Sequence, residues 1–351
     1  MKVQVLVVDD SALMRKLISD LLESDPRIEV VDTARDGVEA IEKTCRLHPD
    51  VVTMDIQMPR MSGLDALSHI MGQCPTPVVV LTGLTDPNLA FEALERGAVD
   101  FVLKPSGTIS VDIYKVRQEL VEKVKLATLV NLRKVTAKIA PASPIALRAP
   151  PGTPGKRAVA VGASTGGPKA LDHLLSSLPV GLPAPVLVVQ HMPPGFTRSF
   201  AERLNQRSPL LVKEAEEGDA VLPGRAYVAP GDHHMLIERQ GGREIIRLDK
   251  SPRVKGLRPS ADVTMRSVAD VYGAGSIGVV LTGMGSDGAE GLKAIKERGG
   301  VTIAQDRATS IIYGMPRAAV ESGCVDKVLP LDKIPGEIVR LLGERLRYNA
   351  L

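Results

Sequence analysis

Tryptophan is absent from this sequence, and aromatic residues make up only 3% of its 351 positions. Proteins that bind single-stranded nucleic acid stack the bases on aromatic side chains, and those that bind duplexes present strongly basic surfaces. The formal net charge is only +3. Neither kind of surface is indicated, so we expect no nucleic-acid partner.

Cysteine is also scarce. The three cysteines, Cys45, Cys74 and Cys324, are scattered along the chain and form no C-x-x-C pair. A disulfide framework and a zinc ribbon are therefore both unexpected, because each needs a characteristic cysteine spacing. A reducing cytoplasm suits such a chain.

Long hydrophobic runs are missing as well. The N-terminal stretch MKVQVLVVDD has a short apolar run that ends at two aspartates. No uninterrupted apolar span approaches the roughly 18 residues of a membrane helix. We expect a cytoplasmic protein with no direct membrane insertion.

The residues that are present suffice for two domains, since 44% are apolar and 24% are charged. Apolar runs at 3–8, 28–31, 51–54, 78–81 and 100–103 alternate with stretches of helical periodicity. Strands that alternate with helices predict a doubly wound parallel sheet, an α/β fold. The site of such a fold lies at the carboxyl ends of its strands.

Polar residues follow four of these runs: Asp9, Asp10, Asp55, Thr82 and Lys104. Three neighbouring carboxylates repel one another unless a hard cation such as Mg²⁺ joins them, and Mg²⁺ also recruits phosphate oxygens. The lysine and the hydroxyl are suited to hold further phosphate oxygens. We therefore predict a Mg²⁺ and phosphate site at this edge of the sheet.

A proline-rich segment separates the two halves of the chain. Apolar spacing predicts a last helix at 109–135, and residues 136–157 then contain five prolines among Ala and Gly. This composition favours an extended tether over a packed core. We expect domains at 1–125 and 158–351, joined by a helical and then Pro/Ala-rich linker at 126–157.

The second half begins with the stretch VAVGASTGGP, which reads as a strand, a tight turn and a helix. Ser164 stands in the turn, among Gly162, Gly166 and Gly167. The amide-rich start of a helix favours developing negative charge, so we interpret Ser164 as a nucleophile. The alternative is a non-catalytic module in which these glycines cradle a phosphate or nucleotide.

A base and an orienting acid are available at two later strand ends. His191 follows the apolar run 186–189, and Asp287 follows the run 277–281 in the stretch TGMGSDG. A neutral imidazole can accept the serine proton while a carboxylate orients it, and the glycine-rich turns can supply oxyanion donors. Spacing alone leaves four rivals open: His233, His234, Asp232 and Asp219.

The remaining histidines carry less weight. The adjacent residues Asp232, His233 and His234 suggest a metal site, but a third ligand at a useful spacing is missing. Surface or packing roles are expected for the histidines in predicted helices or their flanks: His48, His69 and His173.

Residues 1–125 resemble a response-regulator receiver domain, which has a flavodoxin-like fold. By that resemblance Asp55 accepts a phosphoryl group from a histidine, and Asp9 and Asp10 hold Mg²⁺ with it. The resemblance also implies that Thr82 and Lys104 contact the phosphoryl group and that Phe101 is the switch aromatic residue. The added charge then biases a two-state surface.

Six motifs of the second half resemble the CheB family of chemotaxis protein-glutamate methylesterases and protein-glutamine glutaminases. They are GASTGGP, QHMPPGFTRSFAERLN, APGDHHM, RPSADV, LTGMGSDG and YGMPRAA, in the family's order. The resemblance implies a mainly parallel α/β methylesterase domain with Ser164, His191 and Asp287 as its triad. It also implies an oxyanion donor at the Met284 amide and a supporting role for Thr165.

The resemblance further implies demethylation of glutamate methyl esters and deamidation of glutamines on the cytoplasmic helices of methyl-accepting chemoreceptors. Both reactions are acyl transfers through a glutamyl-serine intermediate and need no cofactor. A chemotaxis histidine kinase is the expected phosphodonor. One alternative is the same chemistry on a receptor array outside motility. Another is a receiver with a DNA-binding output, which would need a basic helix-turn-helix that this half lacks.

Overall fold

The computed structural model describes residues 2–83, 87–104, 111–132, 135 and 156–348. The chain divides into two compact units, Met1–Lys138 and Ile139–Leu351. Most of the predicted proline-rich tether, residues 136–155, lies outside the described residues. Among the described residues, no helix is both long and apolar enough to cross a bilayer.

The first unit is built on a five-stranded parallel sheet with the order β2-β1-β3-β4-β5. The strands are β1 (Val3–Val8), β2 (Ile28–Ala34), β3 (Val51–Asp55), β4 (Val78–Thr82) and β5 (Asp100–Leu103). Residues in β3 and β4 are buried throughout, as expected for strands with helices on both faces. This order is that of the flavodoxin-like fold, so the predicted doubly wound sheet is confirmed.

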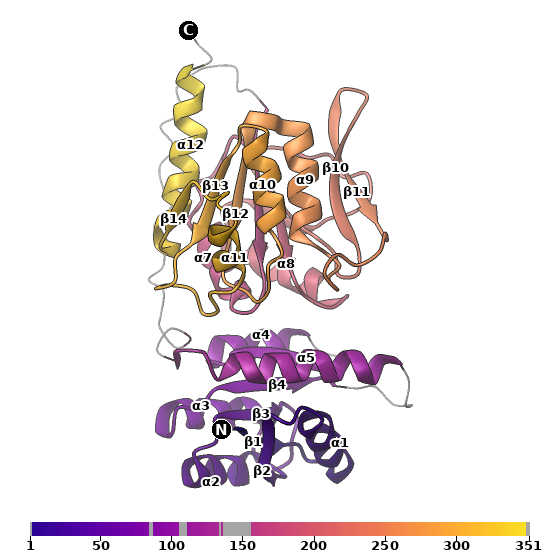
Figure 1. Ribbon diagram of the computed structural model, residues 1–351, viewed down its shortest axis with the longest axis vertical. Helices are drawn as coiled ribbons and strands as arrows, with labels where there is room; N and C mark the ends of the chain where they lie inside the picture. Colours follow the sequence, from indigo (N-terminus) through magenta and orange to yellow (C-terminus); the bar gives the residue numbers. More distant parts are fainter. Residues whose placement is uncertain (1, 84–86, 105–110, 133–134, 136–155, 349–351) are drawn as a thin grey trace. The chain divides into compact units, whose positions relative to one another are not determined.

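In the described part of the first unit, the helices that cover this sheet (Figure 1) are α1 (Ala12–Glu23), α2 (Gly37–Leu47), α3 (Gly63–Gln73), α4 (Pro87–Arg96) and α5 (Val111–Ala127). Helix α1 packs against α5, whereas α2 packs against α3 and α3 against α4. Helix α5 ends before the predicted residue 135. There the Thr128 hydroxyl donates a 2.7 Å hydrogen bond to the Lys125 carbonyl, which competes with continuation of the helix.

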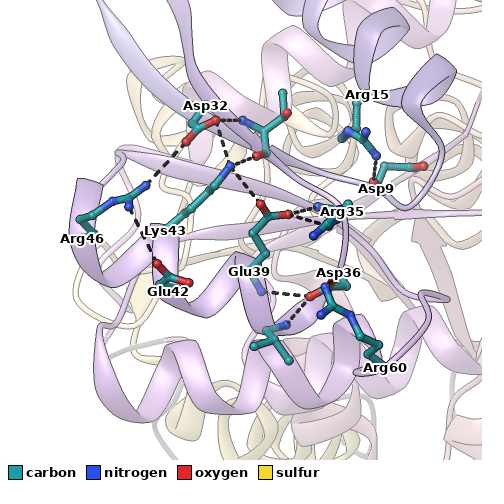
Figure 2. A network of polar contacts seen from close by, with 12 residues as sticks. Asp9, Arg15, Asp32, Arg35, Asp36, Glu39, Glu42, Lys43, Arg46 and Arg60 are labelled. Atoms are coloured by element: carbon teal, nitrogen blue, oxygen red, sulfur yellow. Dashed lines mark hydrogen bonds and ion pairs between the residues drawn. The ribbon is translucent and has the colours of Figure 1, made fainter.

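A network of charged side chains ties α2 to its surroundings (Figure 2). The Lys43 ammonium lies 3.1 Å from the Asp32 carboxylate on β2 and 3.4 Å from that of Glu39 on α2. Asp36 caps the start of α2 and forms an ion pair with Arg60, which lies in the segment after β3. The segment that follows Asp55 is thereby anchored to α2.

The chain contains a disulfide, although the scattered cysteines gave no reason to expect a disulfide framework. Cys45, near the end of α2, is bonded to Cys74, the C-cap residue of α3. The two residues are 29 positions apart in sequence, but α2 packs on α3 and brings their Cα atoms to 5.4 Å. Cysteine spacing missed the bond because the pairing arises from packing between helices. Cys324 is buried and free.

The second unit contains a seven-stranded sheet in the order β14-β13-β12-β6-β7-β9-β8, in which every pair is parallel. Its strands are β6 (Ala158–Ala163), β7 (Val186–Gln190), β8 (Leu211–Glu214), β9 (Arg225–Val228), β12 (Ser276–Val280), β13 (Val301–Gln305) and β14 (Lys327–Leu329). The predicted mainly parallel α/β fold is confirmed. An antiparallel hairpin of β10 (His234–Gln240) and β11 (Arg243–Asp249) packs beside the sheet against α9.

The described helices of this unit are α7 (Gly167–Ser177), α8 (Phe196–Arg207), α9 (Ala261–Tyr272), α10 (Ala289–Glu297), α11 (Met315–Glu321) and α12 (Ile334–Tyr348), with 3₁₀ turns η1 (Gly273–Gly275) and η2 (Leu331–Lys333). Strands β6, β7 and β12 are buried at every position and form the centre of the core. The candidate site lies at the carboxyl ends of these three neighbouring parallel strands.

Candidate active site

The register of β6 and β7 brings Ser164 and His191 to neighbouring positions. Ala163, the last residue of β6, is paired with Gln190, the last residue of β7. Ser164 and His191 are the next residues of the two chains, and the His191 N–H donates a 3.2 Å hydrogen bond to the Ala163 carbonyl. Two side chains that are 27 positions apart therefore leave the sheet at the same edge.

Backbone and amide contacts hold the turn that carries Ser164. Its N–H donates to the Thr282 carbonyl at 3.1 Å, and its carbonyl accepts from the Gly167 N–H at 2.7 Å. The same carbonyl accepts a 3.0 Å hydrogen bond from Gln190 Nε2. Gly166, with φ of 78°, lets the chain turn directly into α7. Ser164 consequently lies beside the positive end of a helix dipole.

His191 and Asp287 are joined by a 2.8 Å contact between Nε2 and Oδ2. The Asp287 carboxylate is fully buried. It also accepts a 2.7 Å hydrogen bond from the Ser260 hydroxyl and bonds of 2.6 and 3.1 Å from the N–H groups of Ala261 and Asp262. The carboxylate of Asp287 therefore lies at the N-terminus of α9.

These contacts keep Asp287 ionised. Burial by itself raises the pKa of Asp287, but the hydrogen bond and charge of His191 act in the opposite direction, as do the donors at the start of α9. The net result is a pKa well below its usual range. A carboxylate that stays charged can orient the imidazole and stabilise the imidazolium form.

The imidazole nitrogen that remains for Ser164 is Nδ1, because Nε2 is used by Asp287. Among the described residues the Ser164 hydroxyl has no hydrogen-bond partner. Catalytic hydrogen bonds to a nucleophile commonly tighten only when substrate is bound. Thr165 is buried next to it, and its carbonyl accepts a 3.0 Å hydrogen bond from the Thr282 hydroxyl.

The segment after β12 approaches Ser164 closely. A Cβ atom added to Gly283 would lie 2.7 Å from the Cβ of Ser164 and 2.4 Å from the Sδ of Met315. The Gly283 carbonyl is held by the N–H groups of Gly314 and Met315. In the described part of the chain, the next N–H, that of Met284, has no acceptor. An unpaired N–H beside a nucleophile is suited to bind an oxyanion.

Three residues that support this site were not predicted from the sequence. Gln190 is buried and donates from Nε2 to the carbonyls of Ser164 and His191, at 3.0 and 3.3 Å. Ser260 binds Asp287, and the Thr282 hydroxyl bridges the carbonyls of Thr165 and Ile312. All three stand in the motifs quoted above: Gln190 directly precedes His191, Ser260 lies in RPSADV, and Thr282 lies in LTGMGSDG.

The rival residues are engaged elsewhere. Asp232 pairs with Arg253 at 2.6 Å and Arg258 at 2.8 Å. The ring of His233 lies 3.3 Å from the Gly231 carbonyl. His234 is buried and contacts the Pro252 carbonyl, while Asp219 pairs with Lys213. The described residues contain one cluster of three or more possible metal ligands, and it lies in the first unit rather than here.

That cluster consists of Asp9, Asp10 and Asp55, with carboxylate oxygens all within 4.8 Å of one another. It lies where β1 and β3 end. The Lys104 ammonium, just after β5, is 2.8 Å from Asp9 Oδ2 and 2.7 Å from Asp55 Oδ2. Thr82 ends β4 and is buried. The predicted residues are therefore gathered at one edge, and the three carboxylates form a donor set that suits Mg²⁺.

Asp55 and Lys104 influence each other's ionisation. Burial raises the pKa of Asp55, and the neighbouring Lys104 only partly offsets that effect. Burial lowers the pKa of Lys104, but hydrogen bonds to Asp55 and Asp9 outweigh burial and raise it. Arg15 donates to the carbonyls of Asp9 and Asp10 at 2.8 and 3.0 Å and so holds the acidic turn.

Phe101 lies on β5 and is buried. Its ring meets that of Phe91 on α4 edge to face, with centroids 6.5 Å apart. The Lys123 ammonium lies 5.3 Å from the centre of the Phe101 ring and donates to the Phe101 carbonyl at 2.6 Å. The predicted switch residue thus occupies an inward position in this structure.

Family models and curated relatives match both halves of the chain. The model for the CheB methylesterase matches residues 159–338, and the model for the response regulator receiver domain matches residues 5–111. The chain belongs to the CheB methylesterase family. A relative from Pyrococcus abyssi, named protein-glutamate methylesterase/protein-glutamine glutaminase, is 51% identical over 97% of this chain and 93% of its own length.

Other members of the CheB family also match this chain. One from Thermotoga maritima with the same name is 46% identical over 97% of this chain and 98% of its own length. The crystal structure of the Thermotoga maritima CheB methylesterase catalytic domain superimposes with a TM-score of 0.52 and 47% identity. It covers 53% of this chain and 98% of that domain. The family resemblance inferred from the motifs is therefore confirmed.

Proposed function

We propose that this protein is a phosphorylation-activated serine hydrolase of chemotactic adaptation. It removes methyl groups from glutamate methyl esters and deamidates particular glutamines on the cytoplasmic helices of chemoreceptors. The His191–Asp287 contact at the strand edge beside Ser164 is the observation that carries this proposal. The names of the relatives support the substrate class, and they do not favour a receptor array outside motility.

The residues of the second unit have distinct roles in the proposed reaction. His191 Nδ1 accepts the proton of the Ser164 hydroxyl while Ser164 Oγ attacks the glutamyl carbonyl. The Met284 N–H stabilises the resulting oxyanion, and Asp287 stabilises the imidazolium. His191 returns the proton to the leaving group, which departs as methanol from an ester or ammonia from an amide.

Water completes the reaction. With His191 again acting as the base, a water molecule attacks the glutamyl-serine ester and releases glutamate and free Ser164. Thr165 and Gln190 support this cycle by holding the turn around Ser164. The Thr165 carbonyl accepts a hydrogen bond from the Thr282 hydroxyl, and Gln190 Nε2 donates to the Ser164 carbonyl. One triad thus serves both the ester and the amide substrate.

The first unit regulates this activity. Asp55 attacks a phosphoryl group carried by the histidine of a chemotaxis kinase and becomes an acyl phosphate, while the histidine leaves. Asp9 and Asp10, with Asp55, would hold Mg²⁺, which neutralises negative charge when it is bound. Lys104 and Thr82 contact the phosphoryl oxygens, and Phe101 changes position in response.

The test measures methanol release from methylated receptor fragments by the full-length protein, with and without Mg²⁺ and a small phosphodonor. Ser164→Ala should lower turnover by about a thousandfold or more, because the covalent intermediate is lost. Ser176→Ala, near the far end of α7, is the matched control and should leave turnover unchanged. Near-parental turnover by Ser164→Ala would exclude the nucleophile.

Asp55→Asn tests the regulation separately. This variant should keep basal Ser164-dependent turnover and lose its stimulation by the phosphodonor. Stimulation that persists in Asp55→Asn would remove Asp55 from its proposed role. Release that depends on Ser164 but never responds to the phosphodonor would keep the hydrolase and reject the receiver's control.

A further inference from the structure

Two aspartates at the proposed site cap each other's helices. Asp287 precedes α10 and accepts hydrogen bonds from the N–H groups of Ala261 and Asp262 at the start of α9. Asp262 lies in the first turn of α9 and accepts 2.8 Å hydrogen bonds from the N–H groups of Gly288 and Gly291 at the start of α10. A helix start favours a carboxylate, because its first N–H groups lack intrahelical partners. Each helix start is therefore completed by the other aspartate.

Lys255 extends this arrangement to the segment between them. Its ammonium lies 2.9 Å from Oδ2 of Asp262 and donates a 3.1 Å hydrogen bond to the Ser286 carbonyl. The Asp262 side chain is only 1% exposed, whereas that of Lys255 is 38% exposed. Lys255 thus reaches from the surface to a buried carboxylate and, on the way, holds the backbone one residue before Asp287.

The segment 284–288 has little to restrain it from within. Gly285 and Gly288 both adopt positive φ, 85° and 91°, and glycine leaves the backbone free to sample many conformations. Yet this segment carries both the Met284 N–H and the Asp287 carboxylate. Contacts from outside the segment must therefore set the distance of both groups from Ser164 and His191.

We propose that Lys255 and Asp262 are positioning residues for the hydrolytic reaction. Lys255 holds the Ser286 carbonyl, and Asp262 holds the Gly288 N–H, so that the segment 284–288 keeps its shape when the oxyanion forms. Both residues act through this segment, and the reaction proposed above assigns neither of them a contact with the substrate. The inference rests on the roles proposed above for Met284 and Asp287.

A loosened oxyanion donor has a characteristic kinetic effect. The Met284 N–H interacts with charge that develops only in the transition state, so its displacement lowers kcat and leaves KM nearly unchanged. A residue that merely stabilises the fold would instead lower the melting temperature without changing kcat in the protein that remains folded.

Lys255→Met in the full chain is the decisive variant, since it removes both contacts from a partly exposed position. We expect kcat for methanol release to fall about tenfold, as displacement of a reacting group by a fraction of an ångström does. KM should stay unchanged, and the rate of Ser164 labelling by a fluorophosphonate should fall in parallel. Lys255→Arg, which retains a cationic donor, should recover most of the loss.

Lys296→Met is the matched control. Lys296 lies in the last turn of α10 and pairs with Asp326 at 3.1 Å, far along the helix from the segment 284–288. It should leave kcat and labelling at parental values. Asp262→Asn provides a second variant, since it retains an oxygen for the two glycine N–H groups but loses the ion pair with Lys255. It should lower kcat in the same direction as Lys255→Met.

Parental kcat and labelling in folded Lys255→Met would overturn the inference, and so would an equal loss in Lys296→Met. The labelling ratio between Lys255→Met and the parent needs no receptor substrate. The labelling ratio therefore tests the positioning role even if the protein releases no methanol from the receptor fragments. Failure of the proposed function is detected separately, by turnover that survives Ser164→Ala.

Discussion

The disulfide between Cys45 and Cys74 yields a stability prediction of defined size. The bond spans a sequence separation of 29 residues, and the closed loop contains β3 and the proposed phosphorylation position Asp55. A cross-link restricts the unfolded chain by an amount that grows with the logarithm of loop length. For this loop the chain-entropy model gives a stabilisation of about 3.5 kcal/mol at 25 °C.

We expect the double variant Cys45→Ser/Cys74→Ser to lose this stabilisation. Unfolding entropy is about 2.1 cal/mol/K per residue, so over the first unit the loss corresponds to a melting temperature lower by about 12 °C. Calorimetry and urea denaturation of the full chain measure the change. A reductant should lower the stability of the parent to that of the double variant, and it should leave the double variant unchanged.

Thiol titration in denaturant separates two ways in which this reasoning can fail. Without reductant, one reactive thiol is expected, that of Cys324. Three reactive thiols would show that the bond does not form in the isolated protein. One thiol together with equal stability of parent and double variant would refute the loop-entropy argument. Disulfides are rare in the cytosol of mesophiles and common inside hyperthermophiles, so the outcome also bears on the environment of the chain.

Three further predictions concern the two sites. The lowered pKa of Asp287 contributes stability that is complete above the unfolded-state pKa of 3.8 and is lost as pH falls below it. In urea titrations the destabilisation caused by Asp287→Asn should therefore shrink on acidification, and a penalty independent of pH would contradict this. Gly167→Ala would place a Cβ 2.0 Å from Gln190 Oε1, so we expect a loss of about 1–3 kcal/mol in urea denaturation and slower Ser164 labelling. Lys104→Met removes the cation 2.7 Å from Asp55 and should slow Mg²⁺-dependent phosphorylation by a small phosphodonor, followed by mass spectrometry; an unchanged rate would exclude Lys104 from the phosphoryl site.

The fold class could be predicted from the sequence because its signals are local. Apolar runs such as 51–54 and 78–81 alternate with helical periodicity, and this pattern predicts a strand at each run and helices between the runs. A parallel sheet then gathers its strand ends at one edge. For that reason Asp55 and Lys104, which are far apart in the chain, could be expected to meet.

The pairing of remote side chains was not available from the sequence. Their positions at strand ends made His191 and Asp287 candidates, yet spacing left His233 and Asp232 as rivals. The register of β6 against β7 and the hydrogen bond of Asp287 to the start of α9 distinguish the candidates from these rivals. These contacts depend on how helices and strands pack, and the pattern of neighbouring residues in the sequence does not predict that packing.

The two α/β units, the strands that end at each site and the chemical types of residue there follow from local patterns in the sequence. The bond between Cys45 and Cys74, the contact of Gln190 with Ser164, and the link from Lys255 to Asp262 depend on tertiary packing. Periodicity and turn formation act over only a few residues. Side-chain contacts between distant segments arise only when helices and strands have packed into one register.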